Sequence, residues 1–397
     1  MKAPKVGLAV IAAVTLALTS CSSGTPAASS GGSTGGSGGG SAENAAMKIC
    51  VYTHGDGGGF WSVAKKGAEK AAKDLGITLD YQESNNDPQK QAQLIEAGVS
   101  GGCKALAVSA PAPDAIKDAL KKATAAGIPI VTMNSGSKVF KDLGAFTHIG
   151  QDEFIAGAEA GKKFKEMGVT KLLCPIQEAN NIGLQERCDG AKSTFGNVEN
   201  LQLSAGLSDM AKSEAEVQAK LTADTSIDGV FALNADIATG AAIPAAAAAG
   251  RKFTIGTVDL SADAVQAIKD GKLAFAIDQQ QFAQGYLSVS VLYLNLLNGH
   301  VLGGGQPIYT GPGFVTKDNA DLVQKLVAGE HAVGSGGKME KQLHLLGRRV
   351  YLVPVYNELI GIEVHSELIE GELVLRALGG VVCAAHYGVH PGQQLLH

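Results

Sequence analysis

From Lys48 onward the chain alternates between short apolar runs and amphipathic segments, and this alternation limits its possible folds more than any other feature. Strands that alternate with helices pair in parallel, and their right-handed crossovers place helices on both faces of the sheet. The first series therefore predicts one doubly wound α/β unit. Its predicted strands are 48–53, 77–81, 104–109 and 128–132, with helices predicted at 60–75, 88–99 and 114–126.

A second series of the same kind follows the connection at 134–144, so we expect two α/β lobes joined by a hinge. The length of 397 residues also exceeds one domain of about 100 to 200 residues. A ligand of such a protein is expected in the crevice beyond the carboxyl ends of the strands. We assign lobe 1 to 47–149 plus about 280–312, and lobe 2 to 150–279 plus about 313–331. The second series has predicted strands at 146–149, 171–175, 200–203, 229–233, 254–258 and 272–278, then a helix at 282–297.

The N-terminus reads as an export signal followed by a tether. Lys2 and Lys5 precede a mostly apolar run at 6–18, which is too short to span a bilayer but typical of a signal peptide at 1–20. The residues before Cys21 resemble a bacterial lipobox, so we expect Cys21 to be lipidated; the alternative is an ordinary signal with an incidental cysteine. A Gly/Ser-rich stretch completes a flexible tether at 21–46. The expected location is extracytoplasmic, anchored to the cell membrane.

Charge and motifs exclude several functions. Without residues 1–20, 31 basic residues face 38 acidic ones, which disfavours nucleic-acid binding. The loop at 55–59 fails the dinucleotide fingerprint because Phe60 stands where a third glycine is needed, and no nucleophile elbow or zinc-spaced cysteine pattern occurs. We predict no enzyme activity, no cofactor and no metal site, with a secreted sugar-acting hydrolase as a minor alternative.

Four cysteines are placed for disulfide bonds, which are favoured outside the cytosol. Cys50 lies in the first predicted strand and Cys103 at the entry to its expected neighbour, while Cys174 and Cys188 flank one strand-to-helix connection. We expect two bridges, with four buried thiols as the alternative. Cys383 has no expected partner.

Five segments, in this order and spacing, resemble the type I periplasmic sugar-binding proteins, the ribose-binding-like receptors of ABC importers. The resemblance covers about 48–317. It implies a protein that captures a small neutral sugar or polyol between closing lobes and delivers it to an ABC transporter permease; a receptor for a chemotaxis or sensor-kinase system is the alternative. A monomer is expected. The segments are 53–61, 127–135, 187–190, 231–234 and 270–279.

In lobe 1, the resemblance implies that Phe60 and Trp61 stack on the apolar faces of a sugar ring, although either could instead pack onto the core. Asn134 stands where ribose binders usually have Asp, and the next position also departs from the family, so the hydroxyl pattern should differ from that of ribose. His54 and Asp56 could compensate for the missing carboxylate at position 134. Ser109 matches a further contact position.

In lobe 2, the resemblance implies four ligand-binding residues: Arg187, Asn234, Asp259 and the hinge residue Gln279. Together they offer hydrogen-bond donors and acceptors suited to neighbouring hydroxyls. The structural alternatives are an ion pair between Arg187 and Asp189 or Glu186, and a helix cap by Asp259 near Ser261.

The C-terminal segment at 332–397 resembles no family known to us. Residues 345–355 and 359–375 alternate apolar and polar positions like short strands, and six of the nine histidines fall at or after His331. We interpret this tail as an appended module or as sequence foreign to the natural end of the protein.

Overall fold

The computed structural model describes residues 44–327 and five short strands between 350 and 385. The expected signal peptide, Cys21 and nearly all of the tether lie outside the described residues, as does most of the tail. In the described part of the chain, no helix has the length and apolar character needed to cross a membrane. The tail strands form an antiparallel pair, β13 (Val350–Val355) with β14 (Glu358–Glu363), and an antiparallel set of three, β15 (His365–Ile369), β16 (Glu372–Ala377) and β17 (Gly380–Ala385).

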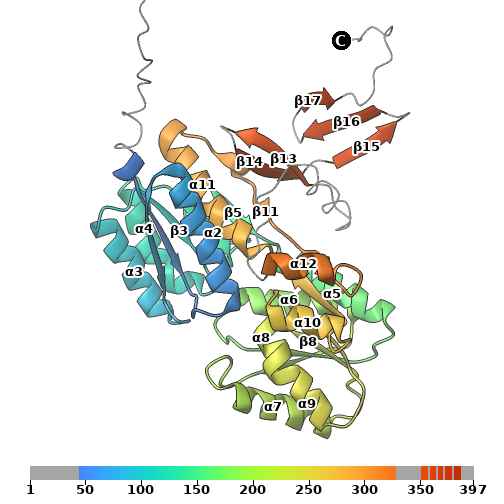
Figure 1. The fold of residues 1–397 in the computed structure, drawn as a ribbon. Helices are drawn as coiled ribbons and strands as arrows, with labels where there is room; N and C mark the ends of the chain where they lie inside the picture. Colours follow the sequence, from blue (N-terminus) through green and yellow to red (C-terminus); the bar gives the residue numbers. More distant parts are fainter. Residues whose placement is uncertain are drawn as a thin grey trace, which may run out of the picture.

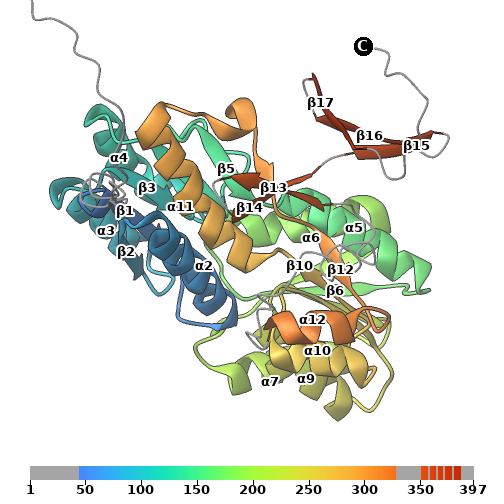
Figure 2. The same cartoon turned by 45° about the horizontal axis from the view of Figure 1, so that its top comes forward.

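Lobe 1 contains a six-stranded parallel sheet in the order β11-β5-β4-β3-β1-β2. Helices α2 and α11 lie side by side in both ribbon views although they are far apart in sequence (Figures 1 and 2). The elements are β1 (Lys48–Thr53), α2 (Gly59–Leu75), β2 (Thr78–Glu83), α3 (Pro88–Ser100), β3 (Ala105–Val108), α4 (Pro113–Ala125), β4 (Ile130–Asn134), β5 (Thr147–Gly150), α11 (Gln281–Asn298), the 3-10 turn η2 (Leu302–Gly305) and β11 (Ile308–Tyr309).

Lobe 2 contains a second six-stranded sheet in the order β12-β10-β9-β8-β6-β7, parallel except for the edge strand β12. The two doubly wound lobes that the alternation predicts are confirmed. The elements are α5 (Glu153–Glu166), β6 (Leu172–Ile176), α6 (Ile182–Phe195), β7 (Val198–Gln202), α7 (Met210–Ala223), β8 (Gly229–Ala232), α8 (Ala235–Ile237), the π-helical η1 (Ala238–Ala242), α9 (Ile243–Ala248), β9 (Thr254–Val258), α10 (Ala262–Lys269), β10 (Phe275–Asp278), β12 (Gly313–Val315) and α12 (Ala320–Val327).

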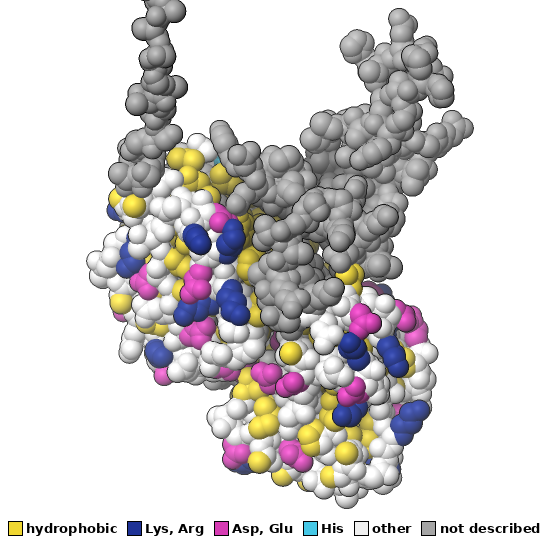
Figure 3. All heavy atoms as spheres, in the orientation of Figure 1, with side chains coloured by type: hydrophobic (Ala, Val, Ile, Leu, Met, Phe, Trp, Pro, Cys, Tyr) yellow, Lys and Arg dark blue, Asp and Glu magenta, His cyan; other side chains and the backbone are white. Residues whose placement is uncertain are grey.

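The chain passes between the lobes three times. The crossings follow β5, follow β10 and join β11 to β12. Lobe 1 therefore includes α11 and β11 from late in the sequence, and lobe 2 includes β12 and α12, which follow them. The two lobes appear as separate bodies in Figure 1, with lobe 1 in blue and orange and lobe 2 in green, yellow and orange. On the face drawn in Figure 3, acidic and basic side chains are mixed over both lobes.

Glycines let one pair of helices in each lobe pack with their backbones in direct contact. A Cβ atom at Gly67 or Gly285 would overlap a backbone carbonyl of the opposite helix in the α2/α11 pair. The same holds for Gly157 and Gly190 in the α5/α6 pair. Such close approach positions the N-terminal turns of α2, α5 and α6 firmly beside the crevice.

The two expected disulfide bonds are present, one in each lobe. Cys50 bonds to Cys103 and Cys174 to Cys188, with Cα atoms 5.8 and 6.1 Å apart, inside the usual range. The first bridge joins β1 to the entry of β3.

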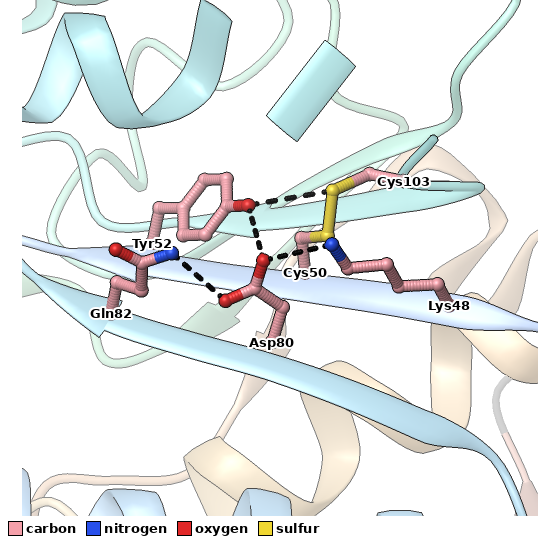
Figure 4. Close-up of a disulfide and its surroundings, with 6 residues drawn as sticks. All are labelled: Lys48, Cys50, Tyr52, Asp80, Gln82 and Cys103. Atoms are coloured by element: carbon pink, nitrogen blue, oxygen red, sulfur yellow. Dashed lines mark hydrogen bonds and ion pairs between the residues drawn. A yellow bond between two sulfur atoms is a disulfide. The ribbon is translucent and has the colours of Figure 1, made fainter. Parts of the chain in front are cut away.

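A polar group surrounds the Cys50–Cys103 bridge (Figure 4). The hydroxyl of Tyr52 lies 3.0 Å from Asp80 Oδ2 and 3.4 Å from Cys103 Sγ, and Lys48 Nζ lies 3.1 Å from the same carboxylate oxygen. Cys50, Cys103 and Asp80 come close enough to suggest a metal site. Because both sulfurs are bonded to each other, no thiolate is available, and one carboxylate alone makes a poor metal site.

Candidate ligand-binding site

A narrow cleft separates the two lobes at the carboxyl ends of their parallel strands. It encloses a cavity of about 40 Å³, a few times the volume that one water molecule needs by this measure. Nine of the ten residues expected to bind ligand line it. They are His54, Asp56, Phe60, Trp61, Asn134, Arg187, Asn234, Asp259 and Gln279.

Aromatic side chains form part of the lobe 1 wall. Phe60 and Trp61 stand in the first turn of α2, and their rings meet edge to face with centroids 5.0 Å apart. Both are only 7% exposed and also belong to the hydrophobic core of the lobe. A Cβ atom at Gly55 would lie 2.8 Å from Trp61 Cγ, so glycine leaves room for the indole ring. The two rings therefore serve the core and the cleft together.

His54 lies beside Trp61, with ring centroids 4.7 Å apart. Its backbone N–H donates to Ser109 Oγ at 2.8 Å, and its Nδ1 lies 2.7 Å from the same oxygen. Burial, with a smaller contribution from the charge of Arg187, lowers the pKa of His54 to about 3. His54 is thus a neutral ring at physiological pH. Ser109 is fully buried behind His54 and does not line the cleft.

Asn134 completes the lobe 1 wall at the end of β4. Its backbone adopts the left-handed region, with φ of 60°, which Asn tolerates better than most residues. Its side-chain oxygen accepts a hydrogen bond from the Ser135 hydroxyl at 3.0 Å. Asp56 lies on the loop between β1 and α2, where its carboxylate accepts from the Gly58 N–H at 3.0 Å.

Arg187 projects from α6 into the lobe 2 wall. Its Nε donates to Glu153 Oε2 at 2.6 Å and its guanidinium to the Leu233 carbonyl at 2.7 Å. The alternative pairing of Arg187 with Asp189 or Glu186 is wrong, because the tight α5/α6 contact brings Glu153 to it instead. Glu153 is 2% exposed, so this is a buried ion pair. Arg187 also lines the cleft.

Asn234, Asp259 and Gln279 form a connected polar chain in lobe 2. Asn234 Nδ2 lies 3.4 Å from one oxygen of Asp259, and Gln279 Nε2 donates to the other at 2.5 Å. Burial raises the pKa of Asp259 to about 7, against the opposing effects of Arg187 and the Gln279 hydrogen bond. The alternative helix-cap role of Asp259 is wrong, because Ser261 caps α10 by accepting from the Ala264 N–H.

Four further polar residues line the cleft and were missed in the sequence: Gln177, Glu178, Asn181 and Asp236. Gln177 and Glu178 follow β6 directly, in the same position as the predicted residues at other strand ends. Their position directly after a predicted strand was the sequence signal that could have identified them as lining residues. Burial, followed by the neighbouring Asp56, raises the pKa of Asp236.

Direct contacts join the lobes across the cleft. The Ile182 N–H donates to the Pro111 carbonyl at 3.1 Å, whereas Glu178 Oε2 approaches His54 Nε2 only to 3.8 Å, beyond hydrogen-bond distance. Asp236 in lobe 2 accepts a hydrogen bond from the backbone of Gly59 in lobe 1. The lobes are therefore drawn together around the cleft.

Uncharged amide side chains fill the crossings between the lobes. Gln151 Nε2 donates to Glu153 Oε2 at 2.9 Å, and Gln284 Nε2 donates to the Gln279 carbonyl at 3.0 Å. Gln151, Gln279 and Gln284 are each at most 1% exposed. Asp152, next to Gln151, caps α5 by accepting from the Ile155 N–H.

The fold and the cleft can now be compared with known proteins. Residues 49–300, well over half of the chain, match the family model described as the periplasmic binding protein domain. This chain belongs to the periplasmic binding protein family. The resemblance to the type I sugar-binding members is confirmed by relatives of that kind.

Among those relatives, the ribose import binding protein of Haemophilus influenzae is 29% identical over 234 residues, covering 58% of this chain and 79% of the relative. The fructose import binding protein of Bifidobacterium longum is 30% identical over 238 residues, covering 56% and 72%. A solved structure, the carbohydrate transporter from Acidothermus cellulolyticus in complex with myo-inositol, is 38% identical with a TM-score of 0.68. That match covers 98% of the solved chain and 71% of this periplasmic binding protein.

Proposed function

We propose that this chain is an extracytoplasmic solute-binding protein that captures a neutral sugar or sugar alcohol between its two lobes and delivers it to an ABC importer. Binding proceeds by lobe closure, without covalent chemistry and without a cofactor. We further propose that the protein is monomeric and that acyl chains on Cys21 anchor it to the membrane through the Gly/Ser-rich tether.

One observation carries the proposal: polar groups of both hydrogen-bonding kinds converge on the cleft from both lobes, next to aromatic rings. Arg187 offers only donors and the ionised form of Asp259 only acceptors, while Asn134, Asn234 and Gln279 offer both. Each hydroxyl of a polyol is both a donor and an acceptor, so this mixture can satisfy a ligand that carries many of them. The rings of the lobe 1 wall supply contact for the C–H faces of the same ligand.

The charges of the cleft favour an uncharged ligand over an anionic one. The positive charge of Arg187 is already paired with Glu153. Carboxyl groups outnumber it among the remaining lining residues, and like charges at short range oppose the binding of sugar phosphates or sugar acids. The carboxyl groups are those of Asp56, Glu178, Asp236 and Asp259.

A cyclic polyol such as an inositol is the first ligand to test. The solved carbohydrate transporter that is 38% identical to this chain holds myo-inositol. An inositol ring presents hydroxyls around its whole edge, which matches polar groups that reach the cleft from six different strand ends and from α6. The ring-stacking side chains would lie against one of its faces.

A thermal-shift screen tests this function. Inositols, pentoses, hexoses and linear sugar alcohols are compared with sugar phosphates, and a ligand at 100 times its dissociation constant should add about 2.7 kcal/mol of stability. Asp259→Asn should abolish the shift. Asp189→Asn, on the exposed side of α6, is the matched control and should keep it. A protein stabilised by sugar phosphates and by no neutral polyol would contradict the proposal.

A further inference from the structure

His54 and Ser109 form a buried hydrogen-bonded pair in which every polar atom can be assigned. The backbone N–H of His54 can only donate, and it does so to Ser109 Oγ at 2.8 Å. Gln91 Nε2 lies 3.4 Å from the same oxygen, but its two hydrogens have nearer acceptors in the carbonyl oxygens of Ser109 and Tyr52, at 2.7 and 3.2 Å. Ser109 Oγ therefore already accepts from the backbone N–H of His54. Its own hydrogen needs an acceptor, because an unmatched buried polar group is costly.

Within the described residues, the only acceptor at hydrogen-bond distance from Ser109 Oγ is His54 Nδ1, at 2.7 Å. The hydroxyl hydrogen of Ser109 consequently points to Nδ1. In a neutral imidazole the other nitrogen then carries the hydrogen. His54 thus presents Nε2–H, a donor, on its far side.

The far side of His54 faces Glu178, which comes from the other lobe. Nε2 and Glu178 Oε2 are 3.8 Å apart, too far for a direct hydrogen bond. Asn181 Nδ2 donates to this same carboxylate oxygen at 2.7 Å and fixes its position. A donor on one wall and an acceptor on the other therefore lie close together across the cleft without a hydrogen bond between them.

We propose that His54 and Glu178 both bind one hydroxyl group of the ligand, whose oxygen lies beside the pair, and that Ser109 is the positioning residue that fixes the donor on His54. The inference deepens the proposed function and rests on it. One hydroxyl oxygen can lie within a normal hydrogen-bond distance of about 2.7 to 3.0 Å of both groups. It accepts from Nε2–H and donates to Glu178.

Such a pair selects a hydroxyl over other substituents at that position. A methoxy group can accept from His54 but has no hydrogen for Glu178, and an ammonium group can donate to Glu178 but cannot accept. Because His54 and Glu178 belong to different lobes, a ligand that hydrogen-bonds to both also stabilises the closed arrangement of the lobes. Burial keeps His54 neutral, so the donor does not depend on pH in the physiological range.

The first test is spectroscopic and needs no ligand. In protein labelled with ¹⁵N-histidine, long-range ¹H–¹⁵N spectra distinguish a protonated from an unprotonated ring nitrogen, and His54→Gln assigns the signals. We expect Nε2 to carry the hydrogen in the wild type. In Ser109→Ala this preference should weaken or reverse. A wild-type His54 protonated on Nδ1 would overturn the inference.

The second test measures affinity by calorimetry for myo-inositol, or for the strongest binder among neutral sugars and polyols if myo-inositol does not bind. Ser109→Ala and Glu178→Gln should each weaken binding about tenfold or more. Ser213→Ala removes an equally buried hydroxyl of lobe 2 and should change affinity less than twofold.

Unchanged affinity in both Ser109→Ala and Glu178→Gln would overturn the inference and leave the proposed function intact. Failure of the wild type to bind any neutral polyol would instead refute the proposed function. If Ser109→Ala does not fold, the wild-type ring spectrum and the Glu178→Gln affinity still decide the matter.

Discussion

The two lobes share one architecture but present different chemistry to the cleft. Lobe 1 contributes aromatic rings, a neutral histidine, an amide and one carboxyl group, that of Asp56, whereas lobe 2 contributes a guanidinium paired with a buried carboxylate and three acids, Glu178, Asp236 and Asp259. Lobe 1 therefore offers mainly apolar contact and uncharged polar groups, and lobe 2 offers most of the ionisable groups. A repeated fold can thus divide ligand recognition between its halves, and we expect the halves to respond differently to mutation and to pH.

The largest effect is expected when the charge of lobe 2 is disrupted. Arg187→Ala leaves Glu153 buried without its partner, which should lower the free energy of unfolding by about 3 to 5 kcal/mol. Urea unfolding measures this loss. Adding Glu153→Gln to Arg187→Met should recover most of the stability, because no uncompensated charge is left. A single Arg187→Ala variant as stable as the wild type would show that lobe 2 does not depend on this pair.

The two disulfide bonds should stabilise their lobes by different amounts, because they restrict the unfolded chain over loops of different length. The Cys50–Cys103 bridge closes a loop of 53 residues and the Cys174–Cys188 bridge one of 14. Chain-entropy estimates give about 4 and about 3 kcal/mol for their contributions to stability. Replacing each pair by alanine and measuring urea unfolding should therefore cost more in lobe 1. A larger loss in lobe 2 would mean that contacts around the shorter bridge, rather than loop length, dominate.

Acid should destabilise lobe 1 through two buried histidines. Burial lowers the pKa of both His54 and His148 to about 3, below the usual 6.5 of an unfolded chain. Between these values the unfolded chain binds more protons, so stability is lost as pH falls below 6.5. The slope approaches about 1.4 kcal/mol per pH unit for each histidine. His148→Gln, away from the cleft, should flatten unfolding curves measured from pH 6.5 to 5; an unchanged slope would contradict this.

Asp259 in lobe 2 should act in the opposite direction and, as a single group, more weakly than the two histidines together. Burial raises its pKa from 3.8 to about 7 in the folded protein. Here the folded state binds more protons between the two values, so stability falls as pH rises from about 4 toward 7, by up to about 1.4 kcal/mol per pH unit. Asp259→Asn should remove that slope in urea unfolding without ligand. Parallel curves for the variant and the wild type would refute the prediction.

The sequence was most informative where local pattern and topology together determine position. Asn134, Asn234 and Asp259 each follow a predicted strand, and parallel strands bring their carboxyl ends to one edge. The disulfide partners were predictable for a similar reason, since Cys50 and Cys103 lie on strands that neighbour each other in a doubly wound sheet.

The parts that the sequence did not reveal depend on contacts between distant segments. Glu153 pairs with Arg187 because two glycines let α5 and α6 touch, which no spacing within either helix indicates. Glu178 gains its importance from facing His54 across the cleft. The sequence predicts Ser109 at the ligand surface, yet the residue that follows a strand can face either way, and here its side chain turns toward the interior.

The three crossings between the lobes also affect how the chain can acquire its structure. Neither lobe is a continuous stretch, because α11 and β11 return to the first sheet and β12 and α12 complete the second. During synthesis, lobe 1 lacks a helix and an edge strand until nearly all of lobe 2 has been made. Both lobes of the nascent chain therefore stay incomplete until the segments after residue 280 have been made, and premature termination near residue 280 would leave both sheets without an edge strand.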